Sequence, residues 1–168
     1  MRSTIHHMGI TVKDLDESIA FYSAAFGLEI VDRALFSGEE LAYVVQVPGA
    51  ELEYAFMAGQ NAVLELIEYK APKGKPYTLR NNDVGAAHCC FVVDDLEETY
   101  EKLLAMGVEF NAPPQTAPDI APFNELKYTY FRDLNGITIE LFQPSDGPLS
   151  LPQLLAAARA AGAREPTS

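Results

Sequence analysis

The feature that most constrains the fold of this chain is an internal repeat, which runs from His7 to His88 at an offset of about half of the 168-residue length. The aligned positions are Val12 with Val93, Asp14 with Asp95, Leu15 with Leu96, Glu17 with Glu98 and Ser18 with Thr99. Further on, Gly27-Leu-Glu-Ile matches Gly107-Val-Glu-Phe with a shift of one residue. This many matches in type and order indicate two copies of one structural unit.

Each copy begins with a strand and continues with a helix. The β-branched segment 7–12 is typical of a short strand, and Asp14 followed by Glu17 forms a capping box at the start of a helix. The predicted buried stripes are Leu15, Ile19, Tyr22 and Phe26 in the first helix, and Leu96, Tyr100, Leu103 and Leu104 in the second. Gly27 and Gly107 end the two helices, because glycine readily takes a positive φ.

Strands follow each helix. They are predicted at Glu29–Leu35, Leu41–Val47, Glu51–Ala58, Ala62–Tyr69, Glu109–Asn111, Glu125–Arg132 and Ile137–Gln143, with a turn at Asp133–Gly136. The chain is thus α+β, with a first βαβββ module at 1–70, a linker at 71–84, a second module at 85–143 and a tail at 144–168. Leu151, Leu154, Leu155 and Ala158 predict a short helix in the tail, and 112–123 is a candidate active-site loop.

The composition excludes several classes of partner. A net charge of −12 repels phosphate backbones and anionic lipids, so we expect no nucleic acid and no membrane as partners. No apolar run approaches the roughly 18 residues that span a bilayer, and the N-terminus has no stretch of signal-peptide length. Cys89 and Cys90 are adjacent on a strand, where a bond between them would be strained, so we expect reduced thiols in a cytoplasmic protein.

Four residues recur at matching places in the two halves. His7 and His88 lie on the first strand of each half, and Glu65 and Glu140 lie on the last. Both glutamates are flanked by apolar strand residues, where a carboxylate is costly to bury unless another group pairs with it. Since a two-fold repeat brings equivalent positions together, we expect these four side chains to converge on one divalent metal.

Two imidazoles and two carboxylates suit zinc, nickel, cobalt, iron or manganese better than calcium. Four protein ligands in an octahedral field leave two neighbouring positions for water or a bidentate substrate. By strand alternation His6 should point away from His7, Glu68 should lie at the surface or the edge of the core, and Cys90 should share a face with His88, as a small apolar filler or as a lining of the cleft.

The segment Ile5–Tyr22, which contains His7 and Asp14, and the segment Asp133–Leu141, which contains Gly136 and Glu140, resemble the opening and closing motifs of the vicinal oxygen chelate superfamily. This superfamily includes glyoxalase I, methylmalonyl-CoA epimerase, extradiol dioxygenases and the bleomycin and fosfomycin resistance proteins. The resemblance implies paired βαβββ modules whose sheets curve into a half-barrel around the metal with the helices outside, in a homodimer. The four ligand positions match those of glyoxalase I and nearly those of the epimerase, which carries glutamine at position 65.

The resemblance implies a metal-dependent isomerase, epimerase or lyase that chelates vicinal oxygens of a small carbonyl or thioester substrate and stabilises an enediolate. Glu140 or Glu65 would move the proton, and no binding residues for an organic cofactor are expected. Glyoxalase I would need basic residues for the glutathione carboxylates, for which Arg33, Arg80 and Lys127 are candidates. The aromatic side chains Tyr54, Phe56, Tyr128, Tyr130 and Phe142 could line a site or pack in the core. The alternatives are a non-catalytic resistance-type binding protein and an iron-dependent dioxygenase, and the metal site could form within one chain or between swapped subunits.

Overall fold

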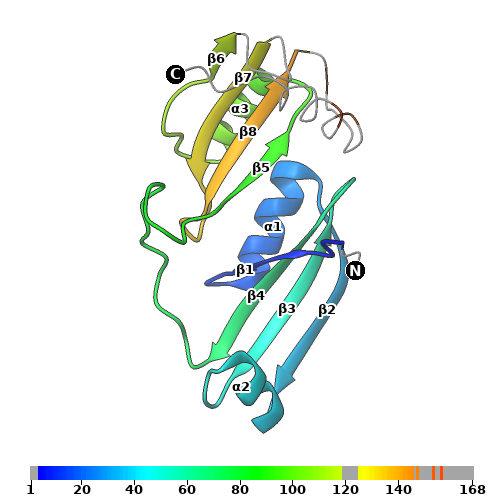
Figure 1. The fold of residues 1–168 in the computed structure, drawn as a ribbon, viewed down its shortest axis with the longest axis vertical. Coiled ribbons are helices and arrows are strands. Elements are labelled where there is room, and N and C mark those ends of the chain that lie inside the picture. Colours follow the sequence, from blue (N-terminus) through cyan, green and yellow to red (C-terminus); the bar gives the residue numbers. More distant parts are fainter. Residues whose placement is uncertain (1–3, 119–124, 146, 148–152, 154–155, 157–168) are drawn as a thin grey trace. The chain divides into compact units, whose positions relative to one another are not determined.

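The computed structural model describes residues 4–118, 125–145, 147, 153 and 156. The chain divides into two compact units, Met1–Tyr77 and Thr78–Ser168. Each unit contains one of the two sequence repeats, and each is a four-stranded mixed sheet with a helix on one face (Figure 1).

The first unit contains two helices and four strands. They are β1 (Met8–Thr11), α1 (Leu15–Phe26), β2 (Glu29–Ser37), α2 (Glu39–Val45), β3 (Glu51–Ala58) and β4 (Val63–Ala71). The strand order is β1-β4-β3-β2, in which β1 and β4 run parallel and the other neighbours antiparallel. The first strand therefore pairs directly with the last strand of its unit, so that residues from the two ends of the repeat lie side by side.

The second unit has the same order of connections. Its elements are β5 (His88–Val92), α3 (Leu96–Ala105), β6 (Gln115–Pro118), β7 (Glu125–Arg132) and β8 (Thr138–Pro144). The strand order is β5-β8-β7-β6, with β5 and β8 parallel. The α+β class and the two βαβββ modules are confirmed, and over the described residues neither sheet closes into a barrel.

The helix signals in the sequence act as expected. The Asp14 carboxylate accepts a hydrogen bond from the Glu17 amide at 2.8 Å, and the Asp95 carboxylate accepts one from the Glu98 amide at 2.9 Å. Gly27 ends α1 with a φ of 67°, which an L side chain rarely adopts. The buried face of α1 is formed by Leu15, Ser18, Phe21, Tyr22 and Ala25, so the predicted stripe is correct for Leu15 and Tyr22, whereas Ile19 and Phe26 are half-buried. Burying each large apolar side chain of this face contributes about 2 kcal/mol.

Alternation along β4 separates two faces of the first sheet. Leu64, Leu66 and Glu68 are buried on the face that α1 covers, whereas Glu65 and Ile67 lie on the opposite face and are half-buried. The predicted difference in register between Glu65 and Glu68 is therefore confirmed. Glu68, however, is 6% exposed and belongs to the core rather than to the surface.

A polar side chain from the last strand holds the start of the helix in each unit. In the first unit a Glu68 carboxylate oxygen accepts a hydrogen bond from the Leu15 amide at 3.0 Å. In the second unit the Gln143 amide oxygen accepts one from the Leu96 amide at 2.9 Å. Glu68 and Gln143 each stand three residues after the glutamate of their own repeat, so the repeat includes this cap.

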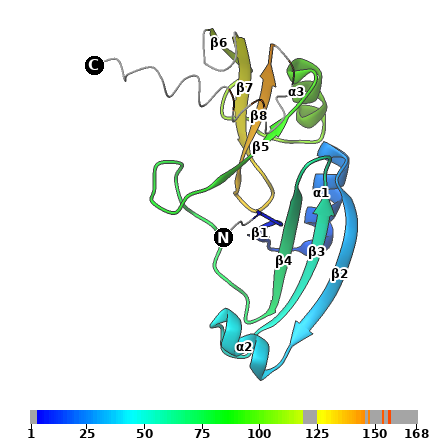
Figure 2. The same cartoon turned by 45° about the vertical axis from the view of Figure 1, so that its right-hand side comes forward.

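The strand predicted at Leu41–Val47 is wrong, because the segment forms the helix α2. Ala42 donates its amide to the Gly38 carbonyl at 3.1 Å, and Glu39 and Glu40 place negative charge in the first turn, which the helix dipole favours. Figure 2 shows α2 at the end of the sheet, between β2 and β3. A short apolar run carries no periodicity that separates a helix from a strand.

The edge strand of the second sheet also differs from its prediction. Of the segment Glu109–Asn111 only Phe110 forms an isolated bridge, to Phe131, and the paired strand is β6, inside the segment predicted as a loop. Prolines at 113, 114 and 118 obscured this strand, because proline is tolerated at a sheet edge but weakens the sequence signal. Residues 119–124 of the predicted active-site loop lie outside the described residues.

The helix predicted in the tail lies almost wholly outside the described residues, apart from the helical positions Gln153 and Ala156. Cys89 and Cys90 are both free thiols. Among the described residues, no helix combines the length and the apolar character needed to cross a membrane.

Candidate metal centre

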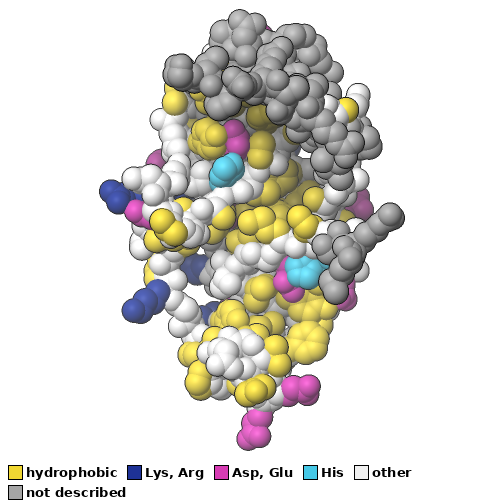
Figure 3. All heavy atoms as spheres, viewed as in Figure 1, with side chains coloured by type: hydrophobic (Ala, Val, Ile, Leu, Met, Phe, Trp, Pro, Cys, Tyr) yellow, Lys and Arg dark blue, Asp and Glu magenta, His cyan; other side chains and the backbone are white. Residues whose placement is uncertain are grey.

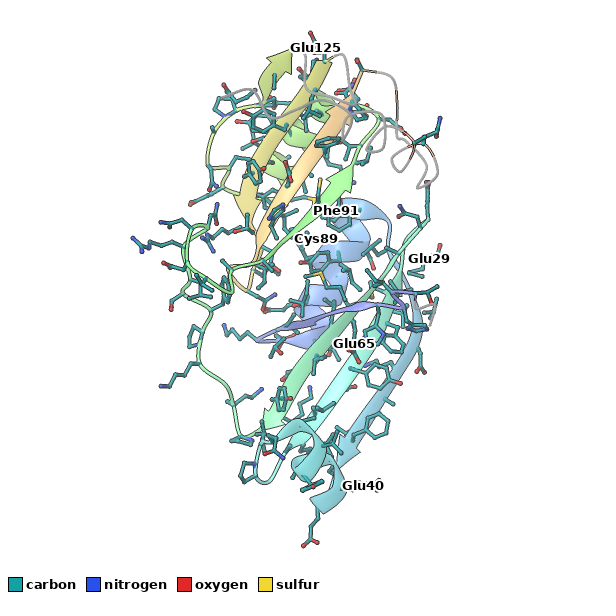
Figure 4. The ribbon with its side chains drawn as sticks, viewed as in Figure 1. Glu29, Glu40, Glu65, Cys89, Phe91 and Glu125 are labelled. Carbon is teal, nitrogen blue, oxygen red and sulfur yellow. The ribbon has the colours of Figure 1, made fainter. Side chains whose placement is uncertain are left out.

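The first unit brings His7 and Glu65 into contact. Parallel pairing of β1 with β4 sets Gly9 beside Glu65, and His7 precedes β1 by one residue. The His7 Nε2 and Glu65 Oε2 atoms are 3.2 Å apart, and Glu65 projects from β4 on the face opposite α1 (Figure 4). The side chains are 36% and 20% exposed, so the pair borders solvent.

The second unit repeats this arrangement with His88 and Glu140. The parallel pairing of β5 with β8 sets Cys90 beside Glu140 and His88 beside Thr138. The His88 Nε2 and Glu140 Oε2 atoms are again 3.2 Å apart. Figure 3 shows histidine side chains on the molecular surface with acidic side chains against them. The predicted ligands are therefore paired within each unit, one histidine with one glutamate.

The spacing within each pair suits two ligands of one metal ion. Two atoms that each lie about 2.1 Å from an ion are about 3.0 Å apart at a right angle and about 3.4 Å apart at the tetrahedral angle. The observed 3.2 Å lies between these values. Among the described residues no group of three or more His, Cys, Asp or Glu side chains could hold a metal, and each unit brings one histidine and one glutamate together.

The two glutamates have different neighbours across their sheets. Tyr130 lies opposite Glu140, and its hydroxyl donates a hydrogen bond to Glu140 Oε1 at 2.6 Å. Partial burial and this hydrogen bond raise the pKa of Tyr130, so the hydroxyl keeps its proton at neutral pH. Phe56 occupies the equivalent place opposite Glu65 and packs on His7, with ring centroids 5.0 Å apart. Tyr130 therefore restrains Glu140, whereas Phe56 offers Glu65 no hydrogen bond.

Gly9 leaves the space that the Glu65 carboxylate occupies. A Cβ atom on Gly9 would lie 3.2 Å from Glu65 Oε2 and 3.6 Å from a methyl group of Ile67. The equivalent position in the second unit is Cys90, which stands beside Glu140. The first pair therefore depends on a glycine that the second pair does not need.

Replacing Gly9 by alanine is expected to displace Glu65 and weaken metal binding about tenfold, the effect typical of disturbing a ligand's supporting contacts. The free energy of unfolding should change by less than about 1 kcal/mol, because the new methyl group lies on the half-exposed face. Titration with cobalt and thermal unfolding measure the two effects, with Thr11→Ala, at an exposed position of β1, as the control. Unchanged cobalt affinity in the Gly9 variant would contradict the close approach of Glu65.

His6, which strand alternation placed away from His7, lies beside it. The Nδ1 atoms of the two rings are 2.8 Å apart, and the ring centroids are 5.1 Å apart. The prediction is wrong because β1 begins at Met8, so the alternation of a strand does not apply to residues 6 and 7. Since Nε2 of His7 faces Glu65, the hydrogen bond between the two Nδ1 atoms holds the other ring nitrogen of His7 and orients the ring.

Replacing His6 by alanine is expected to reduce metal affinity about tenfold, as the loss of an outer hydrogen-bond partner of a ligand usually does. Asparagine at the same position retains a polar side chain and should reduce the metal affinity by a smaller factor. Competition with a chromophoric chelator measures the affinities. An affinity equal to that of the unaltered protein would show that His6 does not position His7.

The basic residues considered for glutathione are all paired with acidic side chains. Arg33 contacts Asp16 and Glu53 at 2.7 Å each, and its backbone register with Ala55 places it on the α1 face. Arg80 pairs with Asp83, and Lys127 pairs with Glu97 of α3. None of these three cations lies free beside a histidine–glutamate pair.

The family of the chain follows from comparison with known proteins. A profile of the Glyoxalase/Bleomycin resistance protein/Dioxygenase superfamily matches residues 4–141, which contain both histidine–glutamate pairs. The chain belongs to this superfamily. The match confirms the resemblance of the two sequence motifs and covers both βαβββ modules.

Two relatives illustrate the range of activities in the superfamily. A 2-epi-5-epi-valiolone epimerase from an Actinomyces species is 29% identical over 150 residues, which cover 86% of this chain and 81% of the relative. A lactoylglutathione lyase from Schizosaccharomyces pombe is 31% identical over 114 residues, which cover 63% of this chain. The aligned part is 38% of that lyase, so its activity belongs to a considerably longer protein.

Solved structures agree on the fold. A glyoxalase family protein from Bacillus cereus superposes with a TM-score of 0.70 and 25% identity, covering 83% of this chain and 93% of that chain. The fosfomycin resistance protein FosX from Listeria monocytogenes, solved with Mn(II) and sulfate, superposes with a TM-score of 0.55 and 20% identity. It covers 92% of this chain and 99% of its own, and at this identity it shows the fold alone.

Proposed function

We propose that His7, Glu65, His88 and Glu140 together bind one divalent metal, and that the protein is an epimerase of hydroxylated carbonyl compounds. The observation that carries this proposal is the recurrence in both units of one histidine–glutamate pair with the same 3.2 Å separation. One unit supplies fewer ligands than the three or four that proteins usually give a transition metal. The site therefore needs a pair from each unit, of one chain or of two chains in a homodimer.

The metal, when bound, would act as a Lewis acid on two vicinal oxygens of the substrate and make the adjacent C–H bond more acidic. The chain supplies the bases. Glu65 and Glu140 occupy equivalent positions in a two-fold repeat, so in the assembled site they would face the substrate from opposite sides. One glutamate, as the carboxylate, removes the proton from one face, and the other, as the carboxylic acid, gives its own proton to the opposite face, which inverts the carbon.

Three observations favour an epimerase over the other activities of the superfamily. The epimerase relative aligns over most of both chains, whereas the lyase relative aligns over 38% of its length. The cations that could bind glutathione carboxylates are paired elsewhere. Non-haem iron oxygenases bind their metal with two histidines and one carboxylate, whereas the proposed site has a second carboxylate, which disfavours a dioxygenase. A binding protein without catalysis would not need four ligand-type residues in matched pairs.

The free thiols Cys89 and Cys90 fit a reducing compartment, and we place the protein in the cytoplasm on that ground.

Size-exclusion chromatography with light scattering would measure the number of chains in the assembly. Mixing an inactive His7→Ala chain with an inactive His88→Ala chain would locate the site. Recovered activity requires a site shared between two chains, whereas inactive mixtures that form mixed dimers require a site within one chain.

Exchange of the α-proton with solvent tests the proposed activity. The protein, stripped with a chelator and reloaded separately with zinc, nickel, cobalt, manganese or iron(II), is incubated in D₂O with a 2-hydroxyketone while proton NMR follows the α-hydrogen. Metal-dependent loss of that signal, with appearance of the second epimer, is the expected result. Oxygen uptake with catechol, in place of exchange, would assign the site to dioxygenase chemistry and overturn the proposal.

A further inference from the structure

Aromatic side chains continue from the His7–Glu65 pair across one face of the first sheet. Phe56 packs on His7, Tyr54 packs on Phe56 at 4.9 Å between centroids, and Phe36 stacks on Tyr54 at 5.7 Å with ring planes 9° apart. These three residues, Phe36, Tyr54 and Phe56, are here called the aromatic row. Figure 3 shows hydrophobic side chains around and below the lower histidine.

The aromatic row is open to solvent at the end away from the histidine. Phe36 remains 49% exposed, and Tyr54 and Phe56 are half-buried. α1 lies on the opposite face of the sheet and does not cover these rings. Exposed aromatic rings that lead directly to a polar pair are typical of a binding surface rather than of a core.

A carboxylate lies alongside the aromatic row. Asp32 stands opposite Phe56 in the β2–β3 register, and one of its oxygens accepts a hydrogen bond from the Tyr54 hydroxyl. No described residue bonds the other oxygen, Oδ1. That oxygen can accept a hydrogen bond from a ligand hydroxyl.

The same face carries no cation. In the strands β1 to β4, all of which the structure describes, Arg33 and Lys70 lie on the α1 face, where they pair with Glu53. The face with the aromatic row carries Asp32 and Glu65 instead. Glu65 would be neutralised as a metal ligand, so the charge of Asp32 is what disfavours a carboxylate or phosphate beside the row and favours a neutral ligand.

Over its described residues, the second unit lacks the third ring of this row. By register Tyr128 and Tyr130 stand where Tyr54 and Phe56 stand in the first unit. Ala117 stands where Phe36 stands, since Ala117 pairs with Leu126 as Phe36 pairs with Leu52. The extended row is therefore a feature of the first unit, and the repeat does not require it for folding.

We propose that Phe36, Tyr54 and Asp32 form a subsite for the body of a neutral, hydroxylated ring, which makes the substrate a cyclic hydroxyketone. The polarised C–H bonds of such a ring would lie on the negative faces of Tyr54 and Phe36, and a ring hydroxyl would donate to Asp32. The carbonyl end would then point along the row toward His7 and Glu65. This inference rests on the proposed function for the chemistry at the carbonyl, but binding to the subsite can be measured without turnover.

Binding of four probes to the metal-loaded protein tests the subsite. The probes are 2-keto-myo-inositol as the neutral ring, dihydroxyacetone as the acyclic hydroxyketone, S-lactoylglutathione as the anion and catechol as the aromatic ring. Ligand-observed NMR titration gives each Kd for the unaltered protein and for Phe36→Ala, Asp32→Asn and Leu35→Ala. Leu35 is the matched control, because it is apolar, 55% exposed and adjacent to Phe36, but lies in register with Glu53 on the other face.

The ring probe is expected to bind at least about fivefold more tightly than the other three probes, a factor typical of one aromatic contact. Phe36→Ala and Asp32→Asn should each remove most of this preference, while Leu35→Ala and the affinity for dihydroxyacetone stay unchanged. Equal binding of the ring probe by all four proteins would overturn the subsite, as would tighter binding of S-lactoylglutathione or catechol. Ring binding that depends on Phe36, without α-proton exchange of any probe, would keep the subsite and reject the epimerase.

Discussion

Replacing either Glu65 or Glu140 by glutamine will reduce the rate of epimerisation by about 10³-fold, the loss expected when a general base is removed. Glutamine is close in size to glutamate and keeps a carbonyl oxygen that can bind a metal, so metal content should remain near that of the unaltered protein. The two variants should differ in which epimer exchanges its α-proton with solvent. If the two carboxylates serve opposite faces, each variant will exchange the α-proton of one epimer with D₂O and leave the other epimer unlabelled.

The different neighbours of the two glutamates allow a milder change that should affect Glu140 alone. Tyr130 donates to Glu140, so Tyr130→Phe should loosen that carboxylate and slow the exchange that depends on it, leaving the Glu65-dependent exchange unchanged. Glu29→Gln, at an exposed position of β2, should change neither exchange. Exchange of both epimers by both glutamine variants would contradict the assignment of the two bases.

Replacing Glu68 by alanine will lower the free energy of unfolding by about 3 kcal/mol, the cost typical of breaking a buried charge pair. The carboxylate contacts Lys70 at 2.7 Å and Lys73 at 2.6 Å and also accepts the Leu15 amide. Alanine leaves the helix amide and the two ammonium groups without this partner. Urea denaturation of both proteins at pH 7 measures the difference.

The same group makes stability depend on pH. Burial alone would raise the pKa of Glu68, but hydrogen bonds from Lys70, Lys73 and the Leu15 amide outweigh burial and lower it from 4.5 to about 2. The ionised form is therefore favoured in the folded protein. This contribution is present above about pH 4.5 and is lost as the pH falls toward 2. It amounts to about 2 kcal/mol once the partial exposure of the lysines is allowed for.

The repeat supplies a control for this prediction. Gln143 takes the place of Glu68 in the second unit and accepts the Leu96 amide without a charge. Glu68→Gln should therefore keep the cap of α1, lose the ion pairs and cost about 1–2 kcal/mol, and its stability should fall less between pH 5 and 2 than that of the unaltered protein. A glutamine variant as unstable as the alanine variant, or one with unchanged acid sensitivity, would contradict this role of Glu68.

The sequence predicted those parts of the fold that local rules determine. Asp14 and Asp95 begin their helices as expected, because a capping box involves only neighbouring residues. Strand alternation put Glu65 on the face opposite Glu68. The repeat indicated that each half supplies one histidine and one glutamate, and the structure brings these two residues together within each unit.

The remaining features depend on contacts that local patterns do not encode. The position of His6 depends on where β1 begins: because the strand starts at Met8, His6 lies beside His7 rather than on the opposite face. The α2 helix was predicted as a strand because its segment is too short for its apolar residues to show either the helical or the strand period. Burial of Glu68 was not predicted because its partners, Lys70, Lys73 and the start of α1, meet only in the folded unit.

Metal stoichiometry shows whether the four paired side chains share one metal. Elemental analysis and cobalt titration would be carried out on the unaltered protein, on His7→Ala, on His88→Ala and on the double variant, with Glu29→Gln as a control. We expect one tightly bound metal for each set of His7, Glu65, His88 and Glu140, and loss of tight binding in either single variant. Two independent metals per chain, or a single variant that keeps the full affinity of the unaltered protein, would contradict this expectation.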